Sequence, residues 1–254
     1  MAYRPDGPFN TAARGAAGTY AETTTFDVGL RQYMLQVYNY MASGLALTGI
    51  VSYVSANTPA IVNAMYAPVA GGGFQPTLLA WLAMLSPLAV ILVLSFGIQR
   101  MQPRTAQMVF WAFAAAMGLS LTHIFLTFTG ASIARVFFIT AGAFAGLSLY
   151  GYTTKRDLSA FGSFLMIGLF GIVIASVVNI FLASSAMQFV ISVVGVLVFA
   201  GLTAYDTQKI KDIYAESDSH DTYSKKAIMG ALTLYLDFIN MFILLLQLFG
   251  QKRE

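Results

Sequence analysis

Two aspartates are the residues of this chain best placed to do chemistry, because both fall inside long apolar segments. Asp206 lies in residues 201–210 (GLTAYDTQKI), and Asp237 lies in residues 234–242 (LYLDFINMF). An ionisable side chain inside a membrane costs about 2.5 to 3.5 kcal/mol on insertion scales, so such an acid marks a functional site by default. His123 is the third candidate, and we interpret it as a hydrogen-bonded residue at a helix contact rather than as a ligand.

The two aspartates would act as a pair. Their segments are consecutive, so as antiparallel helices they would bring Asp206 and Asp237 to neighbouring depths. Two carboxylates in one low-dielectric site cannot both ionise cheaply, so the pair would share a proton and sense pH. When both are ionised they would suit a hard cation, above all Ca²⁺, completed by carbonyls, water or the side chains of Asn240 and Tyr205. The alternative is a structural acid that bonds to backbone or pairs with Arg100.

The composition places these residues in a membrane protein. Hydrophobic residues make up 57% of the 254 residues and charged residues only 10%, with a mean hydropathy of +0.70. An ordinary soluble domain carries about a quarter charged residues. There are no cysteines, which excludes disulfides and thiolate metal sites. The net charge of +3 comes from residues at the ends of apolar segments, not from one stripe, so we expect lipid and not nucleic acid as the partner.

The apolar runs predict an all-α polytopic membrane protein with seven transmembrane helices. Each run is close to the 20 residues that cross a bilayer. Residues 1–30 are predicted to be a polar, mobile tail, and residues 31–254 a single transmembrane domain. The predicted spans are residues 32–54, 78–98, 106–128, 133–150, 160–182, 187–208 and 227–249. Residues 55–77 are predicted to be an uncharged loop at the membrane interface, and Gly142 and Gly146 are suited to close helix packing.

The basic residues predict the orientation. They gather in the tail, in the turn at Arg100 and Arg104, in the turn after the fourth span and in residues 209–226, all on one side if there are seven spans. By the positive-inside rule this side, with the N-terminus, is cytoplasmic. The basic pair Lys252 and Arg253 is the exception. If that pair dominates, the last helix is re-entrant, with six full spans and a cytoplasmic C-terminus.

Enzyme motifs are absent from the sequence. It holds no metalloprotease, nucleophile-elbow or phosphate-loop pattern, so we expect neither an enzyme nor a cofactor. One enzymatic alternative stays open, because a pair of intramembrane aspartates also resembles the aspartyl proteases that cut inside membranes. Those proteases have Gly-x-Gly-Asp at the second aspartate, whereas Leu234, Tyr235 and Leu236 precede Asp237 here.

Both aspartate segments resemble the transmembrane Bax inhibitor motif family, bacterial branch. The match rests on residues 201–210, centred on Tyr-Asp-Thr-Gln, and on residues 234–242, with agreeing spans over residues 31–250. The resemblance implies six helices around a central seventh, in a bacterial inner membrane. It further implies a pH-dependent calcium leak whose sensor is Asp206 and Asp237, latched by an arginine that best matches Arg100.

The functional hypotheses belong to three classes. The first is a pH-gated cation leak, with calcium preferred, in which protonation of the pair and movement of the second helix open and close a pore. The second is a regulatory protein that binds membrane protein partners of stress or quality-control machinery, with structural acids. The third is the intramembrane protease.

Overall fold

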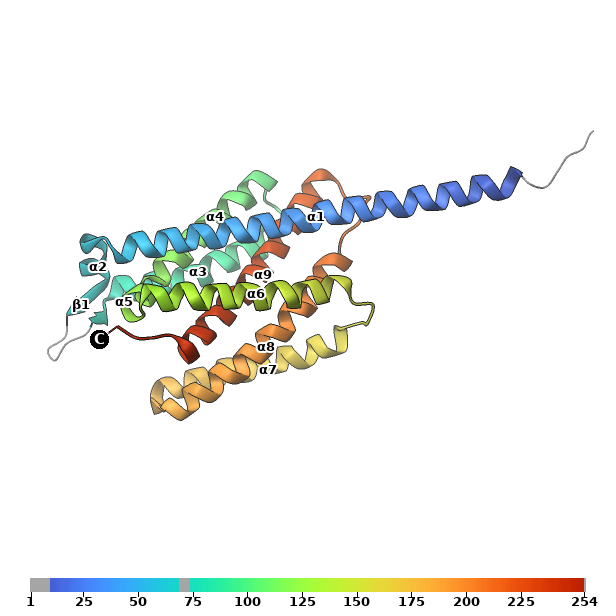
Figure 1. The fold of residues 1–254 in the computed structure, drawn as a ribbon. Coiled ribbons are helices and arrows are strands. Elements are labelled where there is room, and N and C mark those ends of the chain that lie inside the picture. The colour runs from blue at the N-terminus through green and yellow to red at the C-terminus, as the bar shows by residue number, and fades with distance from the viewer. Residues whose placement is uncertain (1–9, 69–73, 254) are drawn as a thin grey trace, which may run out of the picture.

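The structure is a computed structural model that describes residues 10–68 and 74–253, most of which are helical (Figure 1). The helices are α1 (Asn10–Ala56), α2 (Pro59–Met65), α3 (Leu78–Gly97), α4 (Pro103–Ser120), α5 (Thr122–Thr127), α6 (Gly130–Thr153), α7 (Ser159–Leu182), α8 (Ser185–Asp212) and α9 (His220–Phe249). Strands β1 (Tyr66–Pro68) and β2 (Phe74–Pro76) pair antiparallel. This arrangement confirms the predicted all-α polytopic membrane fold.

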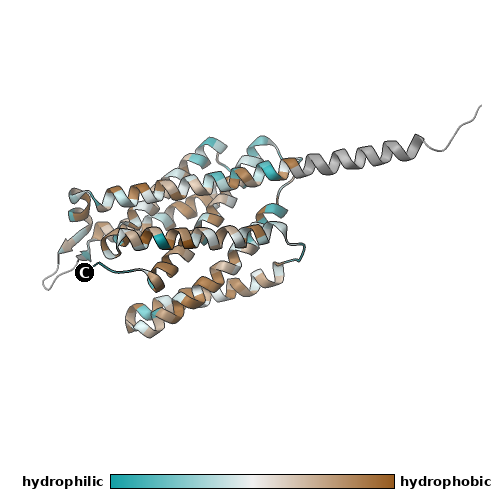
Figure 2. Ribbon diagram, in the orientation of Figure 1, coloured by the Kyte–Doolittle hydropathy of each residue, from teal (hydrophilic) through white to brown (hydrophobic). Residues whose placement is uncertain are grey.

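The helices match the predicted spans closely. Six spans are long and apolar enough to cross a bilayer: α3, α4 with α5, α6, α7, α8 and α9. Residues 28–56 of α1 form a seventh when taken together with α2, which turns away by 87°. Large apolar side chains such as Phe138, Ile180 and Phe181 are more than 70% exposed on the outside of the bundle, where lipid would cover them. Figure 2 shows apolar residues along all these helices.

Two segments differ from the sequence prediction. The segment predicted as an interfacial loop contains α2 and the hairpin of β1 and β2, closed by a hydrogen bond from Thr77 N to Met65 O (2.8 Å). The helix of the first span starts at Asn10, well inside the predicted tail, and no proline follows Pro8 to interrupt it. Residues 1–9 lie outside the described part of the chain, so a mobile tail stays a prediction.

Short polar residues set the helix starts at the turns. Thr129, Ser184 and Ser219 each accept a hydrogen bond from the backbone N–H three residues on, which caps α6, α8 and α9. Ala183, with φ of 48°, closes α7 in the left-handed conformation. These caps allow the tight turns that place consecutive helices side by side.

The last helix is the centre of the bundle. Within its apolar stretch α9 is 67% buried, the largest share of the six spans, and it packs on α8, α1, α6 and α4. It is one unbroken helix, and the short segment after it lies at the end of the bundle opposite the α8–α9 turn. There Lys252 pairs with Phe128 in an isolated antiparallel β-bridge. A full crossing by α9 fits these contacts better than the re-entrant alternative.

Candidate functional site

The two predicted aspartates come together between α8 and α9. Asp237 lies in the middle of α9 and is only 4% exposed, and Asp206 lies half-buried near the C-terminal end of α8. Their carboxyl groups lie within hydrogen-bonding reach of each other. The prediction that consecutive antiparallel helices bring the two acids together therefore agrees with the geometry.

Small residues let α8 and α9 approach closely on both sides of the pair. A Cβ added to Gly230 would lie 3.0 Å from the Ile210 side chain, and one added to Gly195 would lie 2.7 Å from that of Leu244. Glycines at such contacts are how membrane helices pack without large side chains between them. The close packing brings together the two helices that carry the carboxyl pair.

One carboxylate oxygen is left without a partner. Asp237 Oδ2 is buried and accepts no hydrogen bond within the described part of the chain. A buried acceptor without a donor costs about 1–3 kcal/mol or more. A proton on the facing carboxyl, a water molecule or a cation would each satisfy it, so the site is built to take up one of these.

A buried hydroxyl pair fixes α9 beside the site. The Tyr235 hydroxyl lies 2.7 Å from Thr48 Oγ1, and the Thr48 hydroxyl donates to the Ala114 carbonyl (2.8 Å). Tyr235 is fully buried two residues before Asp237, so these bonds tie α1 and α4 to the helix that carries the acid. The partner of Tyr235 lies 187 residues away in sequence, and sequence reasoning missed it.

A second set of hydroxyls leads from the outside of the bundle to α8. The Tyr38 hydroxyl lies 2.7 Å from Ser148 Oγ, which lies 2.9 Å from Thr207 Oγ1. Thr207 directly follows Asp206 and is fully buried. These contacts connect α1 and α6 to α8 one residue from the acid.

Gln208 fixes the turn between α6 and α7. Its side-chain amide donates to the Arg156 carbonyl (2.8 Å), and its side-chain oxygen accepts from the Leu158 N–H (2.9 Å). Thr207 and Gln208, which follow Asp206, thus stabilise the packing of α8 against α6 and the α6–α7 turn.

Comparison with known proteins identifies the family. The family model described as "Inhibitor of apoptosis-promoting Bax1" matches residues 30–254. The chain belongs to this Bax inhibitor family. It is 46% identical to the inner membrane protein YbhL of Escherichia coli over 227 residues, which are 89% of this chain and 94% of that protein. It is 45% identical to an uncharacterized protein of Rickettsia prowazekii over 236 residues (93% and 96%), and 34% identical to an uncharacterized membrane protein of Streptococcus pyogenes over 229 residues (90% and 96%).

The family resemblance implies that Arg100 latches the aspartate pair, but the structure does not place Arg100 beside the two aspartates. Arg100 is exposed in the turn after α3. Among the described residues there is one ion pair, between Lys226 and Asp218 (2.7 Å), and Arg100 takes no part in it. The same turn does meet α9, because Lys225 Nζ donates to the Gln99 carbonyl (3.3 Å). A latch by Arg100 would need a different arrangement of α3 and stays a prediction.

The other candidate residues of this member of the Bax inhibitor family make contacts of their own. Asn240 donates its side-chain amide to the Leu236 carbonyl (2.8 Å), and the Tyr205 ring lies under the Lys209 amine at 5.9 Å. His123 Nδ1 lies 3.0 Å from the Ser120 carbonyl, at the break between α4 and α5. The described residues contain no cluster of three or more His, Cys, Asp or Glu side chains suited to a metal. Any cation at the pair would depend on carbonyls and water for its remaining ligands.

Proposed function

We propose that this Bax inhibitor family protein is a pH-sensitive cation leak, with Ca²⁺ as the permeant ion, gated by Asp206 and Asp237. Protonation changes the charge of the pair and, with it, the repulsion between α8 and α9. With one proton the carboxyls attract each other and hold the helices together, whereas the doubly ionised pair repels itself and attracts a hard cation. The cellular setting we propose is a bacterial inner membrane, with the N-terminus cytoplasmic.

The observation that carries this proposal is the approach of two carboxyl groups within an apolar bundle. A single buried acid, once protonated, could donate to a backbone carbonyl of its own helix. Two acids on neighbouring helices, with Asp237 Oδ2 still without a partner, are instead expensive to keep unless a proton or cation is taken up.

The position of α3 supports a moving gate. This helix is only 17% buried along its apolar stretch, and its main packing partner is α4. It also contains Pro87, which removes one backbone hydrogen bond and is a common place for a helix to bend. Movement of α3 would carry Arg100 with it and bring the proposed latch into play.

The test is Ca²⁺ flux into dye-loaded proteoliposomes between pH 5 and 8. We expect wild-type flux to change with pH, and Asp206→Asn or Asp237→Asn to flatten that dependence. Asp212→Asn on α8 and Asp221→Asn on α9 are matched controls, because both acids are exposed on the same two helices. Flux that is independent of pH in the wild type would refute the proposal.

A further inference from the structure

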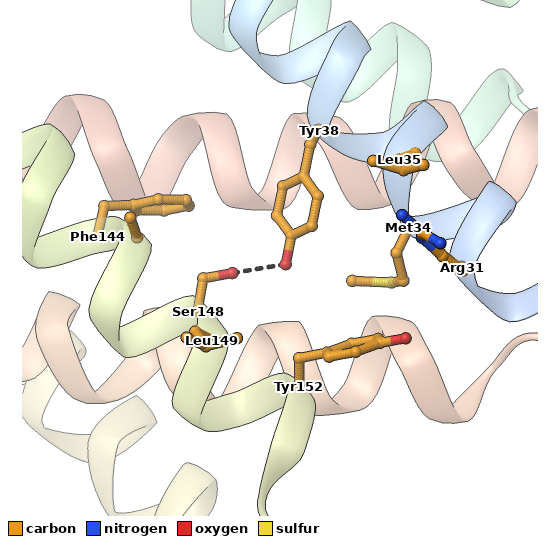
Figure 3. Close-up of a pocket in the computed structure, with 9 residues that line it drawn as sticks. Arg31, Met34, Leu35, Tyr38, Phe144, Ser148, Leu149 and Tyr152 are labelled. Atoms are coloured by element: carbon orange, nitrogen blue, oxygen red, sulfur yellow. Dashed lines mark hydrogen bonds between the residues drawn. The ribbon is translucent and has the colours of Figure 1, made fainter. Parts of the chain in front are cut away.

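A groove runs along the outside of the bundle between α1 and α6, with a volume of about 560 Å³ (Figure 3). Its lining includes Arg31, Leu35 and Tyr38 from α1 and Ala145, Ser148 and Leu149 from α6. Both helices belong to candidate membrane spans, so this groove would face the lipid and not water. The volume falls within the range of binding pockets for small organic molecules.

The walls of the groove are apolar along most of its length. Leu35 is 50% exposed and Leu149 is 62% exposed, while Phe144 lies at the inner end and packs against Phe238 of α9. From Phe144 to Tyr152 the groove follows α6 for about 12 Å at the helical rise of 1.5 Å per residue. That is most of the depth of one leaflet, about 15 Å of a hydrocarbon core of about 30 Å.

Two hydroxyl groups on the floor of the groove are already paired. The Tyr38 hydroxyl and Ser148 Oγ, 2.7 Å apart, point toward each other across the floor, as Figure 3 shows. Ser148 also contacts Thr207, so neither hydroxyl needs a ligand. The interior of the groove therefore suits an acyl chain better than a polar molecule.

The mouth of the groove is positively charged. Arg31 is exposed there and makes no ion pair with any residue that the structure describes. The Lys211 amine donates to the backbone carbonyl of Tyr152 (3.1 Å), a residue that lines the groove, which places a second cation at the edge of the groove. The acid Asp157, in the turn after α6, accepts from the Ser159 N–H (2.8 Å). Basic pockets between membrane helices are typical sites for the headgroups of anionic lipids.

We propose that the groove between α1 and α6 binds an anionic phospholipid, with one acyl chain along α6 and the phosphate at Arg31 and Lys211. The acyl chain would cover the exposed leucines, and the phosphate would lie against the cations at this end. This inference does not depend on ion conduction.

The experiment measures lipid retention by the full-length protein, delipidated in detergent and titrated with dioleoyl phosphatidylglycerol or dioleoyl phosphatidylcholine. Native mass spectrometry counts the bound lipids. We expect one phosphatidylglycerol to bind in preference to phosphatidylcholine. Arg31→Gln should weaken phosphatidylglycerol binding about fivefold, the factor expected for one basic residue near an anionic headgroup.

Matched variants separate this groove from general lipid binding. Ala145→Phe fills the groove and should abolish the preferred site, whereas Ala143→Phe places the same side chain at an exposed position of α6 outside the lining. Arg135→Gln, at the other end of α6, is the control for charge. Gel filtration verifies the fold of each variant, and Arg31→Gln, a surface change, provides the test if Ala145→Phe does not fold. Equal phosphatidylglycerol binding by wild type and Arg31→Gln, or equal binding of the two lipids by wild type, would overturn the proposal.

Discussion

Replacing Gly151 with alanine should push α6 away from α8 next to the aspartate pair. A Cβ at Gly151 would lie 2.9 Å from the carbonyl carbon of Ala204 and closer still to its oxygen. Ordinary van der Waals contact begins at about 3.4 Å, so the two backbones must separate by about 0.5 Å or more. Because both partners are backbone atoms, no side-chain rotation relieves the contact.

The size of the effect follows from the neighbouring contacts. One turn away, Ser148 Oγ and Thr207 Oγ1 are 2.9 Å apart, and a 0.5 Å separation would take this pair beyond ordinary hydrogen-bonding distance. Overpacking costs about 1–3 kcal/mol, and a hydrogen bond between membrane helices adds about 0.6 kcal/mol. We therefore expect Gly151→Ala to lower the free energy of unfolding by about 2 kcal/mol, or Tm by about 4–8 °C for a chain of this size.

The assay is thermal unfolding in detergent, followed by gel filtration of the soluble fraction. Gly146→Ala on the same helix is the matched control, because a Cβ there meets nothing within 4 Å. We expect the control to keep or raise the wild-type Tm, since alanine favours the helix. A Gly151→Ala protein as stable as the control would refute the close packing of α6 on α8.

Three further predictions concern the contacts around the site. Thr48→Val leaves the Tyr235 hydroxyl without its partner and should cost about 0.6–1.7 kcal/mol in thermal unfolding, whereas Thr48→Ser should retain most of the stability. Gln208→Leu frees the turn between α6 and α7 and should speed proteolysis there, and an unchanged cleavage rate would contradict this role. Hydrogen bonds from Ser159 lower the pKa of Asp157 below 3.8, so its stabilising contribution is present above that pH and lost as pH falls through the lowered pKa. Asp157→Ala should therefore lower Tm at pH 7 and have little effect near pH 2, and an equal effect at both pH values would exclude the charge as the cause.

The spans and the meeting of the two acids could be predicted from the sequence because they depend on local features. Long apolar runs fix each helix, and short turns make consecutive helices antiparallel, so Asp206 and Asp237 follow from their places along the chain. Even the break between α4 and α5 lies within one predicted span.

The packing partners could not be predicted in the same way. Gly142 and Gly146 have the spacing of a helix contact, yet a Cβ at either meets nothing within 4 Å, so the prediction of close packing there is wrong. Gly151 is the close contact instead, because the face that α6 turns toward α8 depends on the whole bundle. Tyr38 and Ser148 are 110 residues apart, and nothing local to either residue marks the pairing.

The most direct test of the gating proposal is whether the two aspartates act as one unit. Ca²⁺ flux into dye-loaded proteoliposomes from pH 5 to 8 would compare the wild type, Asp206→Asn, Asp237→Asn and the double variant. A coupled pair predicts non-additive effects, with the double variant close to one of the single variants. Identical background flux in all four proteins would contradict a leak gated by this pair and favour a regulatory protein with structural acids.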